Sequence, residues 1–183
     1  MTEIRWHGRG GQGAITASKI VAMAAFKNGY TGAVMIPTFG TERRGAPIFS
    51  SLKIAREKIY DLSPIETPEI VVVLDHLLLE EVDVAKGLKD GGLVVLNTPK
   101  PVTAYDFGGR RLAVADVGAL SMEAGLPQGR VNSGIIGALC RAADIVPFDS
   151  ILEEIVAEFA GKKPKANADA ARLAYENTTV GVA

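Results

Sequence analysis

The stretch Glu3-Ile-Arg-Trp-His-Gly-Arg-Gly-Gly-Gln-Gly13 decides how this chain is expected to fold. A short apolar run leads into four closely spaced glycines, and a segment with a helical pattern follows at once. The spacing of Gly8, Gly10 and Gly13 fits the turn that joins a strand to a helix in dinucleotide-binding domains. Because the N–H groups at the start of a helix lack internal partners, such a turn can hold an anion. The alternative is a purely structural tight turn.

Strand-like and helical segments alternate along the rest of the chain. Nearly unbroken apolar runs at 70–74 and 93–96 are typical of strands covered on both faces. We expect further strands at 4–6, 33–36, 49–54 and 112–117, and helices at 13–27, 75–88, 132–143, 149–160 and 166–177. This alternation predicts a single α/β domain over residues 1–183, with a doubly wound, mostly parallel sheet and helices on both faces (Rossmann-like). Ligands of such domains bind at the carboxyl ends of the strands.

A second motif follows the strand expected at 33–36. The loop Pro37-Thr-Phe-Gly-Thr-Glu-Arg-Arg-Gly-Ala-Pro47 contains Glu42, Arg43 and Arg44 between glycines and prolines. Guanidinium groups bind phosphate or carboxylate through two parallel hydrogen bonds, and the glutamate could orient one of them. The alternative is an exposed charged loop with an internal ion pair. A nicotinamide site needs a carboxylate where this loop begins with proline and threonine, so the loop suits an anionic ligand better than a bare ribose.

The bulk composition excludes several classes of protein. The chain has 183 residues, 48% of them hydrophobic and 22% charged, which is ordinary globular composition. Its net charge of −1 favours neither nucleic acid nor an acidic membrane surface as a partner. No apolar stretch approaches the roughly 20 residues that cross a membrane. The first residues carry early charges and do not read as a signal peptide, so we expect a cytoplasmic protein.

Few side chains in the sequence suit catalysis. The single cysteine, Cys140, cannot form a disulfide within the chain or hold an iron–sulfur cluster or zinc site, and we expect a buried, inert thiol. The only histidines are His7 and His76, and for His7 a ligand contact and a structural role remain equally open. No serine triad pattern, metal-ligand cluster or Walker lysine is present. We therefore expect no catalytic residue and no metal site here, and a domain that works as part of a larger enzyme.

The two motifs together resemble the gamma subunit of 2-oxoacid:ferredoxin (acceptor) oxidoreductases, a family that includes the pyruvate, 2-oxoglutarate and ketoisovalerate enzymes. Further matching features are the strand at 70–74 that ends before Asp75, the segment 93–97, and Asn132-Ser-Gly-Ile-Ile-Gly137. The resemblance covers nearly the whole chain in order. The indolepyruvate oxidoreductases carry a similar domain, so these motifs do not fix the 2-oxoacid.

The resemblance implies an enzyme that oxidatively decarboxylates a 2-oxoacid to acyl-CoA and passes electrons to ferredoxin. It places thiamine diphosphate and the iron–sulfur clusters on partner subunits, named alpha, beta and a ferredoxin-like delta, and associates this chain with coenzyme A. The implied contacts to ligand or neighbouring subunit are Gly8, Gly10, Gly11, Gln12, Gly13, Glu42, Arg43 and Arg44. The alternatives are a stand-alone Rossmann-type nucleotide-binding oxidoreductase and a non-catalytic nucleotide-binding domain.

Overall fold

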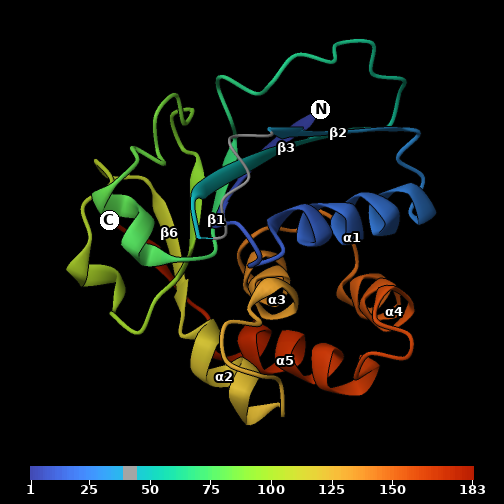
Figure 1. Ribbon diagram of the computed structural model, residues 1–183. Helices are drawn as coiled ribbons and strands as arrows, with labels where there is room; N and C mark the ends of the chain where they lie inside the picture. Colours follow the sequence, from blue (N-terminus) through green and yellow to red (C-terminus); the bar gives the residue numbers. More distant parts are fainter. Residues whose placement is uncertain (39–44) are drawn as a thin grey trace.

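The computed structural model describes residues 1–38 and 45–183, and Figure 1 shows a sheet with α-helices grouped on one side of it. The strands are β1 (Thr2–Arg9), β2 (Gly32–Thr38), β3 (Pro47–Ala55), β4 (Ile70–Val73), β5 (Leu93–Asn97), β6 (Arg111–Ala115) and β7 (Thr179–Val182). The α-helices are α1 (Ala14–Lys27), α2 (Val117–Glu123), α3 (Asn132–Ala142), α4 (Phe148–Glu158) and α5 (Pro164–Asn177). Two short 3-10 helices are η1 (His76–Glu80) and η2 (Val102–Ala104).

The sheet has seven strands in the order β2-β3-β1-β4-β5-β6-β7. β1, β4, β5 and β6 pair in parallel, whereas β3 and β7 run antiparallel to their neighbours. Because β2 is antiparallel to β3, it points the same way as β1. The predicted single α/β domain with a mostly parallel sheet is therefore confirmed. The two apolar runs that predicted central strands form β4 and β5, which are buried almost throughout.

Small residues let the helices lie close to the sheet and to one another. Ala14, Ala17 and Ala24 of α1 are fully buried against the side of β1 that carries Ile4 and Trp6. Figure 1 shows α3 between α1 and α5. A Cβ atom on Gly137 of α3 would stand only 2.0 Å from a carbonyl oxygen of α5. These close contacts fix the positions of α1, α3 and α5 relative to one another on this side of the sheet.

The opposite face of the sheet differs from the sequence-based expectation. The α-helix predicted at 75–88 is the 3-10 helix η1, followed by turns. Gly87 has a φ of 75°, outside the helical region, and a Cβ there would stand 2.2 Å from the carbonyl oxygen of Glu66. The segment instead buries Leu78, Val84 and Leu88 over the second core cluster. On this face, the part of the chain that the structure describes forms 3-10 helices and loops rather than α-helices.

Two further elements were not predicted from the sequence. The strand expected at 112–117 ends at Ala115, because the carboxylate of Asp116 accepts a hydrogen bond from the N–H of Ala119 and caps α2. β7 adds an edge strand at the far end of the sheet, next to β6. Among residues 1–38 and 45–183, no helix is both long and apolar enough to cross a membrane.

Candidate functional site

The glycine turn connects β1 to α1 as predicted. Gly11 and Gly13 have φ values of 94° and 84°, a region that L side chains rarely adopt. A Cβ on Gly13 would also stand 2.8 Å from Nδ2 of Asn132, whereas the space beside Gly11 is open. The close neighbour that selects glycine at position 13 is thus Asn132, the first residue of α3. Gly8 lies within β1.

Arg9 forms a charged network on one side of the turn. Its Nε donates to Oδ2 of Asp75 at 2.8 Å, Nη2 donates to Glu81 at 2.6 Å, and Nη1 donates to the carbonyl oxygen of Gly45 at 3.2 Å. The hydrogen bonds to Glu81 and Asp75 raise the pKa of Arg9. Partial burial alone would raise the pKa of Asp75, but the hydrogen bond from Arg9 holds that pKa below its usual value. This arginine is therefore paired within the chain.

The same network holds the turn in shape. Oε1 of Gln12 accepts a hydrogen bond from the backbone N–H of Arg9 at 2.8 Å. The N–H of Gly10 donates to the carbonyl oxygen of Ala46 at 3.0 Å, which ties the turn to the end of the second motif. Glu42, Arg43 and Arg44 of that motif lie outside the described residues. The ligand contacts predicted for them, and for Gly8, Gly10, Gly11, Gln12 and Gly13, stay predictions.

A cleft of about 680 Å³ opens on the other side of the turn. Gly11, Gly13 and the first residues of α1 line it from one side. The starts of α3 and α5 and the segments that precede them contribute Arg130, Asn132, Lys162, Lys163 and Asn167, and Ile48 of β3 adds an apolar side chain. Three helix starts therefore converge on one space.

The cleft has a positive electrostatic character. Arg130, Lys162 and Lys163 are the charged residues of its described lining, which contains no acidic side chain. In the described structure, no side chain caps these three helices from the residue before each helix, Gly13, Val131 or Lys163. Uncapped N–H groups and the positive end of the helix dipole favour an anion at each of these starts. The arrangement is suited to hold a ligand with more than one negative charge.

Two buried amides shape the floor of the cleft. Asn167 is 4% exposed, and its Oδ1 accepts a hydrogen bond from Oγ of Ser133 at 2.8 Å, which joins α5 to α3. Its Nδ2 donates to the carbonyl oxygens of Lys162 and Lys163. Asn132 is 8% exposed, and its amide forms no hydrogen bond with the described residues. Because buried polar groups are normally paired, Asn132 has donor and acceptor capacity that a ligand could use.

Sequence reasoning missed the lysines, Arg130 and Asn167 of this cleft, and it quoted Asn132 only within the resemblance. One signal was available, because the sequence Gly-Lys-Lys-Pro at 161–164 places a proline at the first turn of α5. That pattern marks the start of a helix with two cations beside it. The sequence could not reveal that this start faces the glycine turn, which lies about 150 residues earlier in the chain.

Neither His7 nor Cys140 belongs to the described lining of the cleft. His7 lies on the opposite side of β1 from Trp6 and does not line the cleft. Cys140 packs against the helix-side core, and burial raises its pKa to about 12, as expected for an inert thiol. Within residues 1–38 and 45–183, no cluster of three His, Cys, Asp or Glu side chains is placed to hold a metal ion.

The topology also differs from a nicotinamide-binding Rossmann domain. In that domain a carboxylate at the end of the second strand holds the ribose of the cofactor. Here β3 lies antiparallel between β1 and β2, and β2 ends in proline and threonine. The geometry therefore gives no support to the alternative of a stand-alone nicotinamide enzyme.

Comparisons with known proteins agree with this architecture. Residues 3–177 match the family described as pyruvate ferredoxin/flavodoxin oxidoreductase. The common gamma subunit of the pyruvate/ketoisovalerate oxidoreductases of Thermococcus litoralis is 45% identical over 98% of both chains. Pyruvate synthase subunit PorC of Methanothermobacter marburgensis is 42% identical, over 96% of this chain and 97% of that protein.

Solved structures extend the likeness to three dimensions. The crystal structure of pyruvate oxidoreductase subunit PORC from Thermotoga maritima has a TM-score of 0.85 and 32% identity over 98% of both chains. A 2-oxoglutarate:ferredoxin oxidoreductase from Magnetococcus marinus, with 2-oxoglutarate, coenzyme A and succinyl-CoA bound, has a TM-score of 0.75. At 20% identity, over 96% of this chain and 30% of that one, the second likeness shows the fold alone. The chain belongs to the pyruvate ferredoxin/flavodoxin oxidoreductase family, whose gamma-type subunits it matches along nearly its whole length.

Proposed function

We propose that this chain is the gamma subunit of an enzyme that converts a 2-oxoacid and coenzyme A to acyl-CoA and carbon dioxide, with the electrons passed to ferredoxin. In this enzyme the cleft at the helix starts binds the phosphate groups of coenzyme A. The observation that carries the proposal is the convergence of Arg130, Lys162 and Lys163 on three uncapped helix starts. The diphosphate and the 3′-phosphate of coenzyme A supply the several negative charges that such a cleft would attract.

The groups of the cleft have distinct tasks in this proposal. The backbone N–H groups of Gly13 and the first turn of α1 donate to the diphosphate. Arg130 offers a planar fork for one phosphate, whereas the two lysines act as mobile point charges. Arg9 and Gln12 hold the turn in shape. Glu42, Arg43 and Arg44 add contacts to coenzyme A or to a neighbouring subunit, as the resemblance implies.

Partner subunits supply the redox chemistry in this proposal. One cysteine cannot provide the four thiolates that an iron–sulfur cluster needs, so the clusters belong to a ferredoxin-like delta subunit. Thiamine diphosphate, bound by the alpha and beta subunits, supplies the decarboxylation. The names of the relatives, which are subunits of pyruvate or ketoisovalerate enzymes, support this division.

The test uses the tagged chain, purified from its native extract with the subunits that remain bound to it. Mass spectrometry identifies those subunits, and calorimetry measures the affinity of the complex for coenzyme A, dephospho-CoA and pantetheine. We expect coenzyme A to bind most tightly. The double variant Arg130→Gln, Lys162→Gln should weaken coenzyme A binding at least tenfold, about 1.4 kcal/mol. The control Lys165→Gln, on α5 outside the cleft, should not.

Two results would contradict the proposal. If the intact chain purifies without a thiamine-binding or cysteine-rich subunit, it is not a subunit of the proposed enzyme. If the double variant and the wild-type complex bind coenzyme A with equal affinity, the cleft is not the coenzyme A site. Tight binding of NAD(H) or NADP(H) by the chain alone would instead restore the stand-alone alternative.

A further inference from the structure

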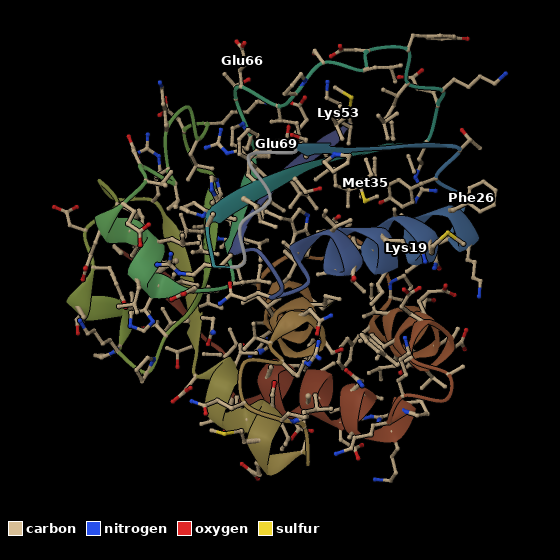
Figure 2. All side chains as sticks on the ribbon, in the orientation of Figure 1. Lys19, Phe26, Met35, Lys53, Glu66 and Glu69 are labelled. Atoms are coloured by element: carbon tan, nitrogen blue, oxygen red, sulfur yellow. The ribbon has the colours of Figure 1, made fainter. Side chains whose placement is uncertain are left out.

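A buried arginine lies on the face of the sheet that carries no α-helix. Side chains alternate along β1, so Arg5 and His7 lie on the opposite side from Ile4 and Trp6. Figure 2 shows Met35 between β2 and α1, and Lys53 on the side of the sheet toward the loop before β4. The register pairs Lys53 with Glu3 and Ser51 with Arg5, which places the arginine on that second side.

Arg5 is 8% exposed, and hydrogen bonds hold its guanidinium in place. Its Nε donates to Nε2 of His7 at 3.0 Å, and its Nη2 donates to the carbonyl oxygens of Val84 and Lys86 at 2.9 and 2.6 Å. Two of these acceptors are neutral backbone groups. The imidazole is neutral as well, because burial and the adjacent Arg5 charge lower the pKa of His7 to about 3.

Within the described residues, the charge of Arg5 is balanced through space by Asp83 rather than by an ion pair. No carboxylate of the described residues lies within ion-pair distance of Arg5, although Asp83 stands in the vicinity and acts on it electrostatically. Buried charges are normally paired, because removing a charge from water costs free energy that neutral acceptors offset only in part. A guanidinium held in place without an ion-paired carboxylate among the described residues therefore indicates that an anion binds beside it.

A pocket of about 710 Å³ lies over these two side chains. Phe49, Ile65 and Val82 give it apolar walls, and the ring of His7 lies 6.1 Å from that of Phe49. Nη1 of Arg5 forms no hydrogen bond with the described residues. Because Nε2 of His7 accepts a hydrogen bond, its proton is on Nδ1, which also has no partner in the described structure. Two donors thus remain for a ligand.

We propose that this pocket binds a carboxylate with an apolar body. Nη1 of Arg5 and Nδ1–H of His7 donate to the carboxylate, and the apolar remainder packs against Phe49, Ile65 and Val82. The pocket is also lined by Glu66, Asp83 and Lys86. Because two of these side chains are acidic, the pocket favours a ligand with one negative charge over a phosphate with two. The carboxylate comes either from a small organic acid or from an acidic side chain of a neighbouring subunit. This site is separate from the coenzyme A cleft and does not depend on it.

The first test observes the guanidinium directly. The full chain, labelled with nitrogen-15 at arginine, is titrated at constant ionic strength with butyrate and phenylacetate, while the Nε–Hε signal of Arg5 is followed by NMR. The matched amides, butyramide and phenylacetamide, control for apolar binding. We expect saturable shifts with the acids and none with the amides. Arg5→Lys should weaken acid binding at least tenfold, because the fork geometry is lost. Arg111→Lys, on β6 outside the pocket, should leave it unchanged.

The second test distinguishes the two sources. If free acids do not bind, the complex of Arg5→Lys with its partner subunits is treated with a carbodiimide, which joins an amine to an adjacent carboxylate. Mass spectrometry of an amide between the introduced lysine and a partner's Asp or Glu would identify the acidic side chain. Absence of both acid binding and this cross-link, with circular dichroism confirming that the variant folds, would overturn the proposal.

Discussion

The two sides of the sheet present positive charge in opposite ways. On the helix side, exposed cations and uncapped helix starts surround an open cleft. On the other side, a single guanidinium is buried among neutral acceptors. Exposed charges keep most of their hydration and are screened by salt, whereas a buried charge is screened much less and must be supported by fixed partners. Taken together, the two proposals predict one salt-sensitive and one salt-insensitive anion site in this domain.

The scaffolds behind the two sites differ as well. Helices held together at glycines define the cleft, and a small change in their spacing moves several binding groups at once. Loops and 3-10 helices define the pocket, where hydrogen bonds to one arginine hold the segments in place. A substitution or a pH change can therefore perturb one side of the sheet at a time.

The largest expected effect concerns helix spacing on the cleft side. Gly137→Ala would place a Cβ atom 2.0 Å from the carbonyl oxygen of Ala171, so α3 and α5 must separate. We expect a loss of ~2–4 kcal/mol in the free energy of unfolding, measured by urea denaturation. Gly118→Ala in α2 is the control, because the nearest atom to its Cβ would be Oδ1 of Asp116 at 3.5 Å and alanine favours a helix. Similar stability of the two variants would mean that the helices tolerate a wider spacing.

The next largest effect is a pH dependence of the free energy of unfolding, which arises from His7 on the pocket side of the sheet. The pKa of His7 is about 3 in the folded chain, against 6.5 as its ordinary value. The unfolded chain therefore binds the proton first, and the stability that depends on neutral His7 falls as the pH drops from about 6.5 toward 3. At about pH 4.5 the loss should reach ~2–3 kcal/mol.

The measurement compares urea denaturation of wild-type protein and His7→Gln between about pH 7 and 4.5. Glutamine keeps an acceptor for Arg5 but does not titrate, so its unfolding free energy should depend less steeply on pH. Parallel pH profiles of the two proteins would show that His7 is not held neutral, and would weaken the contrast between the two sides.

The smallest effect separates backbone strain from contact within the glycine turn. Gly11→Ala should cost ~1 kcal/mol, because φ is 94° and the space beside it is open. Gly13→Ala combines the same strain with a Cβ 2.8 Å from Nδ2 of Asn132, and should cost ~2 kcal/mol. Thermal or urea unfolding of both variants measures the difference. A larger loss for Gly11→Ala would place the critical contact elsewhere in the turn.

Much of the fold could be predicted because its signals are local. The sequence predicted a parallel sheet from the apolar runs of β4 and β5, and a turn at its carboxyl edge from the glycines before α1. The structure confirms both. The segment 75–88 misled the prediction, because its leucines suit a helix while Gly87 must adopt a left-handed conformation against Glu66. Helix propensity summed over a short stretch of sequence takes no account of a contact with a residue outside that stretch.

The sequence by itself determined the α/β class, the strand–glycine turn–helix unit, the lack of thiolates for a cluster, and the family resemblance. Only the tertiary structure decided which residues share a site. Lys162 and Lys163 meet the glycine turn because α5 packs on α3, whose first residue contacts Gly13. Two of the acceptors that hold Arg5 are backbone carbonyl oxygens of a loop some 80 residues later in the chain. Both sites depend on long-range packing, which local patterns of residues do not encode.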